Sequence, residues 1–169
     1  MALPFPTNTF NVAIMALVIF FVPDPAKGVA EMQRVVRPGG TVAAYAWDIL
    51  GGGFTLEPLR VKLRAMGIKP VDPPTVEASR IEAMRDLWTQ AGLEAVETHE
   101  ITVSRTFSNF DEFWDITVSG APSLRSILGR CRVPKLSCSK RECAHAFQAT
   151  PQDVLRTDRA NAVKGRVPE

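Results

Sequence analysis

The chain has 169 residues, a length that fits one domain with a substantial hydrophobic core. Apolar residues make up 46% and charged residues 22% of the chain, and the net charge is only +2. This balance argues against a nucleic-acid partner or an anionic membrane surface, because both require basic residues gathered on one face. We therefore expect no nucleic-acid partner and no membrane partner.

The three cysteines, Cys131, Cys138 and Cys143, are odd in number and irregular in spacing. This pattern is not a disulfide framework, and a reducing cytoplasm fits it best. A zinc site could recruit Cys138, Cys143 and His145, but no second ligand pair follows at finger-like spacing. We expect free thiols, no metal site and a cytoplasmic protein.

An apolar run covers residues 12–22, close to the N-terminus. It has only about half the residues that a membrane-spanning helix needs. No Lys or Arg precedes Lys27, so the charged start of a signal peptide is absent from the sequence. We interpret the run as a buried strand and the turn after it.

Residues 10–47 have the pattern of a strand, a helix and a second strand. Residues 10–16 are apolar without alternation, which is typical of a parallel strand covered on both faces. Asp24 and Pro25 are suited to the N-cap and first position of a helix. Residues 38–40, Pro-Gly-Gly, should end that helix, and the apolar residues 41–47 form the next strand. The two strands should lie parallel and adjacent.

The rest of the chain has a weaker pattern. Gly51–Gly53 predicts a flexible turn and not a phosphate loop, because the Gly-x-Gly-x-x-Gly spacing is absent. We expect a short helix over 55–66 and a secure helix that begins with a Ser79–Glu82 capping box and ends at Gly92. The pattern then favours a long strand over 93–107, a helix capped by Ser108, and a last strand over 154–163.

Two stretches carry a resemblance to a known family. The first is Leu3-Pro4-Phe5-Pro6 up to Phe10, followed by Arg34-Val-Val-Arg-Pro-Gly-Gly-Thr-Val42, and the second is Arg159-Ala-Asn-Ala-Val-Lys-Gly-Arg166. Both are similar to segments of class I S-adenosylmethionine-dependent methyltransferases of the type 11 kind.

The resemblance implies an α/β fold with part of a Rossmann-like sheet flanked by helices. On the family's strand order, 3-2-1-4-5-7-6, residues 10–16 would be strand 4 and residues 41–47 strand 5. Residues 94–106 and 154–163 would be strands 6 and 7. We expect residues 1–169 to be one methyltransferase-like domain truncated at its N-terminal side, without the glycine-rich cofactor loop. Residues 129–152 match the family poorly and are expected to be irregular.

The resemblance also implies where ligands would bind. Ligands of open α/β sheets bind outside the carboxyl ends of the strands. The cofactor S-adenosylmethionine would then lie against Ala16, Leu17, Val18 and Phe21. A small-molecule methyl acceptor would lie near Tyr45, Trp47, Phe113 and Trp114.

Each candidate for the acceptor site has a purely structural alternative. Tyr45 and Trp47 could pack beneath the loop 48–56, and Phe113 and Trp114 could pack within their own helix region. Asp48 could be a base, although the pattern favours an exposed loop carboxylate. No residue is predicted to be catalytic.

Two hypotheses on function remain open from the sequence. The first is methyl transfer from S-adenosylmethionine to an unknown small molecule. The alternative is a catalytically inactive remnant, or an accessory or dimerisation domain, that cannot bind the cofactor alone. In both cases Phe10–Ala16 would be an uncovered apolar sheet edge, so we expect a homo-oligomer through this strand.

Overall fold

The computed structural model describes residues 2–65, 67, 69–70, 72–119 and 154–169. The strands are β1 (Phe10–Ala16), β2 (Val36–Trp47), β3 (Glu94–Phe107) and β4 (Val154–Arg166). The helices are α1 (Pro25–Val35), α2 (Glu57–Ala65), α3 (Ile81–Gln90) and α4 (Phe110–Ser119), with short 3-10 helices η1 (Ile19–Phe21) and η2 (Val76–Ser79). The poorly matched residues 129–152, and with them the three cysteines, lie outside the described residues.

Two units make up the chain. The first unit contains residues 1–54, 72–102 and 159–169, and the second contains residues 55–71 and 103–158. Strands β3 and β4 have residues in both units. Each unit is described by itself below.

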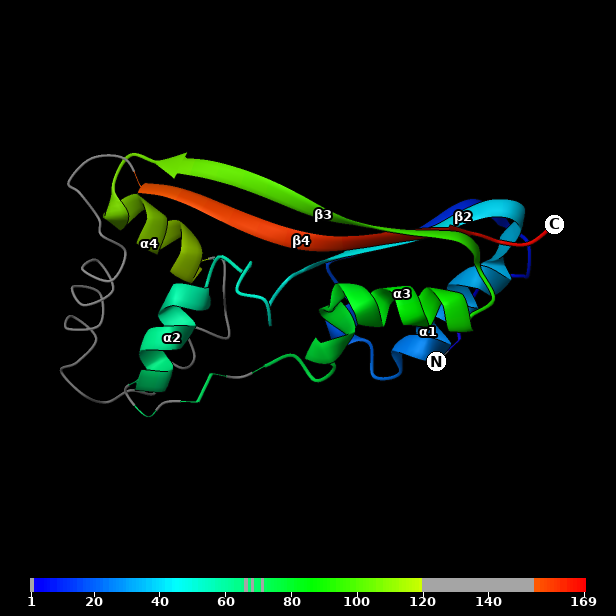
Figure 1. The fold of residues 1–169 in the computed structure, drawn as a ribbon, viewed down its shortest axis with the longest axis horizontal. Coiled ribbons are helices and arrows are strands. Elements are labelled where there is room, and N and C mark those ends of the chain that lie inside the picture. Colours follow the sequence, from blue (N-terminus) through cyan, green and yellow to red (C-terminus); the bar gives the residue numbers. More distant parts are fainter. Residues whose placement is uncertain (1, 66, 68, 71, 120–153) are drawn as a thin grey trace. The chain divides into compact units, whose positions relative to one another are not determined.

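The first unit begins with the expected strand, helix and strand. Strand β1 pairs with β2 in parallel, from Val12 opposite Thr41 to Ala16 opposite Tyr45. Helix α1 starts as its sequence predicts, since the Asp24 carboxylate accepts a hydrogen bond from the Lys27 amide at 3.0 Å and Pro25 follows the cap. The predicted β-α-β unit is therefore present (Figure 1).

Strand β2 begins earlier than its sequence predicts. We expected helix up to Pro38 and strand from Thr41, whereas α1 ends at Val35 and the strand runs from Val36. The Pro-Gly-Gly segment lies inside the strand as an irregularity, and the pairing with β1 shifts there, between Phe10 and Val12. Glycine allows this because Gly39 has a φ of +70°, a conformation that side chains with a Cβ resist.

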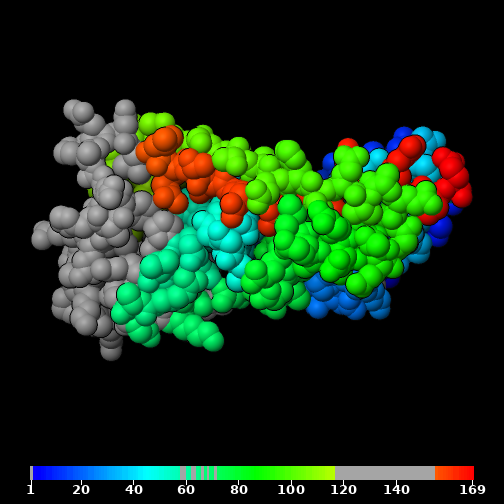
Figure 2. All heavy atoms as spheres, in the orientation of Figure 1, coloured from blue at the N-terminus to red at the C-terminus, as the bar shows by residue number. Residues whose placement is uncertain are grey.

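One face of the sheet carries the hydrophobic core of the first unit. Alternate β2 residues Val42, Ala44 and Ala46 are buried there. They pack with buried residues of α1 and α3 in one cluster, and the space-filling view shows α3 in green beside the blue atoms of α1 (Figure 2). Trp88 of α3 is fully buried, and its indole N–H donates to the Val42 carbonyl at 2.9 Å. The prediction that α3 supplies core residues is confirmed.

The sheet has the strand order β1-β2-β4-β3. Strand β4 pairs with β2 in the antiparallel sense, from Thr41 opposite Arg166 to Trp47 opposite Ala160. This is the order 4-5-7-6 that the resemblance to the family implied. Strand β4 extends to Arg166, three residues beyond its predicted end.

Two helix caps differ from their predictions. Ser79 does not cap α3: its hydroxyl donates to the Val76 carbonyl at 2.7 Å within η2, and Arg80 takes the N-cap position without a side-chain bond. At α4 it is Asn109, not Ser108, whose side chain accepts the Glu112 amide at 2.9 Å. In both cases the neighbouring residue can take part in the turn equally well, so local pattern leaves the cap ambiguous by one residue.

The second unit contains α2, α4 and the adjoining ends of β3 and β4. Its described aromatic residues pack on one another. The Phe107 and Phe113 rings meet edge to face with centroids 5.3 Å apart, and the Phe110 ring lies 5.9 Å from those of Phe113 and Trp114. The aromatic stripe of α4 is therefore a packing surface within this unit.

Candidate functional site

The carboxyl end of β1 is fixed by the backbone of its neighbour. Leu17, the first residue after β1, has a φ of +57°, in the left-handed region that non-glycine residues rarely adopt. Its amide donates to the Tyr45 carbonyl at 2.8 Å. This bond ties the loop after β1 to the end of β2, so that the two candidate binding segments lie side by side.

The loop after β1 has both buried and exposed side chains. Ile19 and Phe20 of η1 are buried at 0% and 4% exposure, whereas Val18 and Phe21 are 43% and 56% exposed. Two of the predicted cofactor-binding residues therefore present apolar side chains to solvent at this sheet edge. Ala16 is exposed as well, and Leu17 is partly buried.

Thr75 holds this loop in place from a distant part of the sequence. Its amide donates to the Phe20 carbonyl at 3.2 Å, and its hydroxyl lies within hydrogen-bond distance of the carbonyls of Ile19 (3.3 Å) and Val22 (3.0 Å). Thr75 is not among the residues predicted from the sequence. Nothing in the pattern around it marks a threonine in a loop as the anchor of a segment more than fifty residues away.

Tyr45 and Trp47 lie on the side of β2 opposite the buried Ala44 and Ala46. Tyr45 is 37% exposed and lines a depression of about 440 Å³. Trp47 is partly buried and packs against the core cluster. The depression is lined by apolar residues together with a few charged and polar ones: Ile14, Ala43, Ala44, Tyr45, Glu97, Thr98, His99, Ile101, Ala162, Val163 and Lys164.

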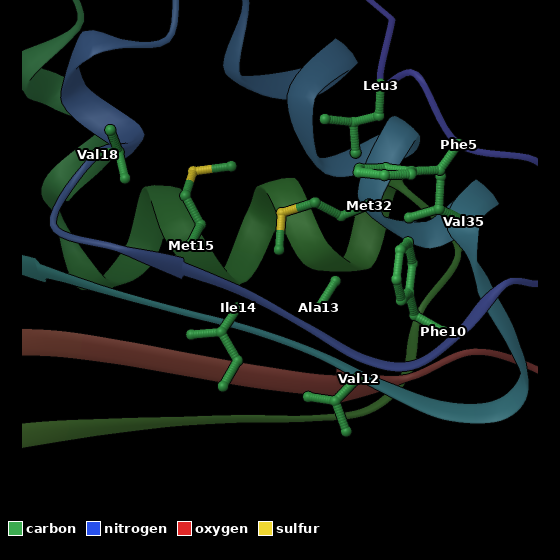
Figure 3. Close-up of a pocket in the computed structure, with 10 residues that line it drawn as sticks. All are labelled: Leu3, Phe5, Phe10, Val12, Ala13, Ile14, Met15, Val18, Met32 and Val35. Atoms are coloured by element: carbon green, nitrogen blue, oxygen red, sulfur yellow. The ribbon is translucent and has the colours of Figure 1, made fainter.

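A second hollow runs along β1 and helix α1 (Figure 3). It measures about 360 Å³ and is lined by Leu3, Phe5, Phe10, Val12, Ala13, Ile14, Met15, Val18, Met32 and Val35. The close-up shows Ala13 and Met15 on the side of β1 that faces the helices, and Val12 and Ile14 on the other side. Of the predicted cofactor-binding residues, this groove contains Val18.

An ion pair on α1 orders the segment that forms one end of this groove. Arg34 bonds Glu31 at 2.8 Å and also donates to the carbonyls of Leu3 (3.2 Å) and Phe5 (3.0 Å). The Leu3 amide donates back to Glu31 at 2.8 Å. The hydrogen bond from Arg34, together with that from Leu3, lowers the pKa of Glu31 from 4.5 to about 2. Glu31 is therefore ionised across the physiological range and keeps the N-terminal segment on α1.

Asp48, directly after β2, is not the exposed loop carboxylate that the sequence favoured. The residue is 7% exposed, and its carboxylate accepts hydrogen bonds from Arg159 Nε and from the Gly51 amide, each at 3.0 Å. The same bonds raise the pKa of Arg159. Asp48 is thus committed to an internal ion pair and is not placed to act as a base. The sequence could not show this pairing, because the two residues are 111 positions apart.

The two remaining acceptor-site candidates, Phe113 and Trp114, belong to the second unit. Phe113 is 2% exposed and packs edge to face on Phe107, whereas Trp114 is partly buried. Tyr45 and Trp47 belong to the first unit.

Within the described part of the chain, no group of three His, Cys, Asp or Glu residues is placed to hold a metal ion. The possible ligands Cys138, Cys143 and His145 lie outside the described residues. None of the helices described is both long and apolar enough to span a bilayer.

Comparison with known proteins shows which proteins this chain is similar to. A family model described as "Methyltransferase domain" matches residues 1–44. An uncharacterized protein of Mycobacterium tuberculosis is 40% identical over 50 residues, which are 30% of this chain and 18% of that protein. The ubiquinone/menaquinone biosynthesis C-methyltransferase UbiE of Ralstonia pickettii is 29% identical over 113 residues, which are 59% of this chain and 46% of that enzyme. The chain thus spans less than half the length of each of these curated relatives.

Solved structures with low sequence identity share the fold. The YcgJ protein of Bacillus subtilis has a TM-score of 0.56 at 18% identity, covering 99% of this chain and 68% of its own. A candidate methyltransferase of Bacillus halodurans has a TM-score of 0.54 at 17% identity, covering 99% of this chain and 74% of its own. Residues 1–44 thus match the methyltransferase family model, and the strand order and structural matches show that the chain has a class I methyltransferase-like fold.

Proposed function

We propose that this chain takes part in the transfer of a methyl group from S-adenosylmethionine to a small molecule. The observation that carries the proposal is the arrangement at the carboxyl ends of β1 and β2. Val18 and Phe21 are exposed in the loop after β1, and the Leu17–Tyr45 backbone bond holds this loop to the end of β2. Ligands of open α/β sheets bind at this edge.

The residues at this edge are suited to the cofactor that the family uses. Val18 and Phe21 are apolar and exposed, and could cover one face of an adenine ring. The rigid loop, fixed by Thr75, gives these side chains a constant position before any ligand arrives. We propose Ala16, Leu17, Val18 and Phe21 as one wall of the S-adenosylmethionine pocket.

Methyl transfer depends more on the orientation of the acceptor relative to the methyl group than on acid–base catalysis. S-adenosylmethionine supplies a methyl group already activated on sulfonium sulfur. The protein's contribution is then to align an acceptor with that methyl group and to exclude water. We propose that Tyr45 and Trp47 take this role from the end of β2. The setting we propose is the reducing cytoplasm, in keeping with the three cysteines.

Calorimetric titration of S-adenosylhomocysteine into the purified chain tests the cofactor proposal. Saturable binding with a micromolar dissociation constant supports it. A Val18→Asp variant, which places a charge in the proposed apolar wall, should weaken that binding, whereas Val61→Asp at an exposed position of α2 should not. Absence of heat at millimolar ligand would reject binding by this chain and favour the catalytically inactive alternative.

We also propose that two copies of the chain associate through β1. Among the described strands, β1 has one neighbour, β2, and its other edge carries no pairing. Val12 and Ile14 on this strand are 49% and 64% exposed, and residues 10–16 contain no charge that would repel a second copy. An apolar, uncharged edge strand readily pairs with another strand. Light scattering on the purified protein should give the mass of a dimer or larger, and a monomer at micromolar concentration would contradict this.

A further inference from the structure

The loop between β2 and α2 is closed by backbone bonds to β4. The Asp48 amide donates to the Arg159 carbonyl at 3.0 Å, and the Arg159 amide donates to the Gly53 carbonyl at 2.8 Å. The Gly53 amide in turn donates to the Asp48 carbonyl at 2.8 Å. Two residues of the loop, Asp48 and Gly53, and the distant Arg159 of β4 thus form one cyclic set of backbone hydrogen bonds directly after the last paired residue of β2.

Side chains reinforce the same closure. The Asp48 carboxylate accepts from Arg159 Nε at 3.0 Å and from Arg159 Nη2 at 2.5 Å, and Arg159 Nη2 also donates to the Gly51 carbonyl at 3.0 Å. The other Asp48 oxygen accepts from the Gly51 amide at 3.0 Å. The Asp48 side chain is 10% exposed and that of Arg159 is 37% exposed, so this charge-assisted pair is partly shielded from water.

The glycine triplet is explained by this pair. A Cβ at position 51 would lie 2.1 Å from the Asp48 carboxylate, and a Cβ at position 53 would lie 2.7 Å from Arg159 Cβ. Gly52 has a φ of +79°, which residues with a Cβ resist. Because these positions have no room for a Cβ or need a positive φ, glycine at 51–53 allows the loop to fold tightly around the ion pair. The predicted turn is present, and its first and last glycines, Gly51 and Gly53, are hydrogen-bonded to Asp48 and Arg159.

The bonds between Asp48, Arg159 and the glycine loop, which we call the clamp, lie directly beyond the residues proposed for the acceptor site. Trp47 is opposite Ala160 in the β2–β4 register and Tyr45 is opposite Ala162, so Asp48 and Arg159 form the next pair beyond Trp47. Glu100 of β3 lies 3.7 Å from Arg159 Nε and extends the charged contact to a third strand. The end of β2 is thereby fastened to β4 at the same sheet edge as Leu17 and Val18.

We propose that Asp48 and Arg159 are positioning residues: their ion pair holds the loop 48–53 closed and so sets where Tyr45 and Trp47 present their rings to a methyl acceptor. The role rests on the proposed function, but the position of the rings can be measured without any ligand. A bond pattern that serves stability alone would leave the Trp47 ring where it is when the side-chain pair is removed, because the backbone bonds of the loop would remain.

The test uses the full chain labelled with 5-fluorotryptophan and observed by 19F NMR. The three tryptophans, Trp47, Trp88 and Trp114, give separate resonances that single Trp→Phe variants assign. We expect Asp48→Asn to shift or broaden the Trp47 resonance by more than its linewidth and to leave the Trp88 resonance unchanged. An unchanged Trp47 resonance in folded Asp48→Asn protein would overturn the proposal.

Two further variants complete the experiment. Arg159→Lys keeps the charge but loses the planar fork that bonds both Asp48 and Gly51, so it should also move the Trp47 resonance by more than its linewidth, and it serves as the test if Asp48→Asn does not fold. Glu77→Gln is the matched control, because it breaks an exposed Arg80–Glu77 pair of the same unit and should move neither tryptophan.

Proteolysis gives an independent readout of loop closure. Chymotrypsin should cleave after Leu50 about tenfold faster in the Arg159→Lys variant than in the wild type, which corresponds to about 1.4 kcal/mol of lost local stability. Equal cleavage rates would contradict the proposed closure. The outcome is separate from that of the cofactor titration: no binding of S-adenosylhomocysteine together with a shifted Trp47 resonance would reject the methyl-transfer proposal and leave the clamp as a structural device of the loop.

Discussion

Single residues in this protein act mainly by joining segments that are far apart in sequence. Trp88 connects α3 to β2 through the Val42 carbonyl, Thr75 fixes the loop after β1, and Arg34 holds the N-terminal segment on α1. Each of these side chains donates hydrogen bonds to backbone carbonyls of a distant segment. Their removal should therefore cost more than the loss of one ordinary contact.

Replacement of Trp88 by Phe removes the indole N–H from a fully buried position. The Val42 carbonyl loses that partner and a small cavity is left, so we expect the free energy of unfolding to fall by about 2 kcal/mol. Urea unfolding followed by circular dichroism measures this. The control Gln90→Ala, at an exposed position of the same helix, should stay within about 0.5 kcal/mol of the wild type.

The Glu31–Arg34 pair predicts a specific dependence of stability on pH. Because Arg34 and the Leu3 amide lower the pKa of Glu31 from 4.5 to about 2 in the folded state, the stabilising contribution is fully present above pH 4.5. It is lost progressively as the pH falls from 4.5 toward 2. The wild type should thus exceed Glu31→Gln in stability at pH 6, and the difference should shrink as the pH is lowered through this window.

Chemical unfolding at pH 6, 4 and 3 measures this difference. The same series on Arg34→Ala, in which the main cause of the lowered pKa is removed, should show a smaller change with pH. A gap between wild type and Glu31→Gln that stays constant from pH 6 to pH 3 would argue that Glu31 acts through packing and not through its charge.

At the scale of elements, β1 is an edge strand with exposed apolar side chains. The sheet buries Ala44 and Ala46 of β2 on its helix-covered side, whereas Val12 and Ile14 of β1 are turned to the other side and are exposed. Parallel strands are usually covered on both faces. This strand is accordingly the element at which we expect a second copy to bind.

A lysine at position 14 tests the association through β1. Ile14→Lys puts a charge on the edge strand, where two copies would bring like charges together, and we expect the dimer to dissociate at concentrations where the wild type remains associated. Analytical ultracentrifugation gives the dissociation constant. Ile101→Lys on β3 is the matched control, since Ile101 is also an exposed isoleucine of the sheet but is not on β1, and it should leave the association unchanged.

At the scale of the whole molecule, cofactor binding should appear as added stability. A ligand that binds the folded state alone stabilises it by about 2.7 kcal/mol when its concentration is 100 times the dissociation constant. We expect S-adenosylhomocysteine at that concentration to raise the free energy of unfolding by this amount, measured by urea unfolding. Adenosine triphosphate, which has the same base and sugar without the amino-acid portion, should give a smaller effect at equal concentration. Equal effects of the two compounds would point to nonspecific binding.

Much of the fold follows from local pattern. The bounds of β1, the Asp24 cap of α1 and the long strand at 94–107 agree with the structure because each rests on signals within a few neighbouring residues. The start of β2 and the cap of α3 do not agree. In both places a proline, glycine or serine is compatible with two local structures, and pairing with distant residues selects between them.

Motifs in the sequence by themselves indicated a resemblance to class I methyltransferases, and this resemblance implied the strand order β1-β2-β4-β3 that the structure has. The sheet edge at which a ligand would bind stays a prediction from the same resemblance. The tertiary structure alone decided the partner of Asp48, the anchor of the loop after β1 and the reason for three consecutive glycines. Each of these depends on side chains that meet only after folding, because a contact between residues fifty or a hundred positions apart leaves no local trace in a single sequence.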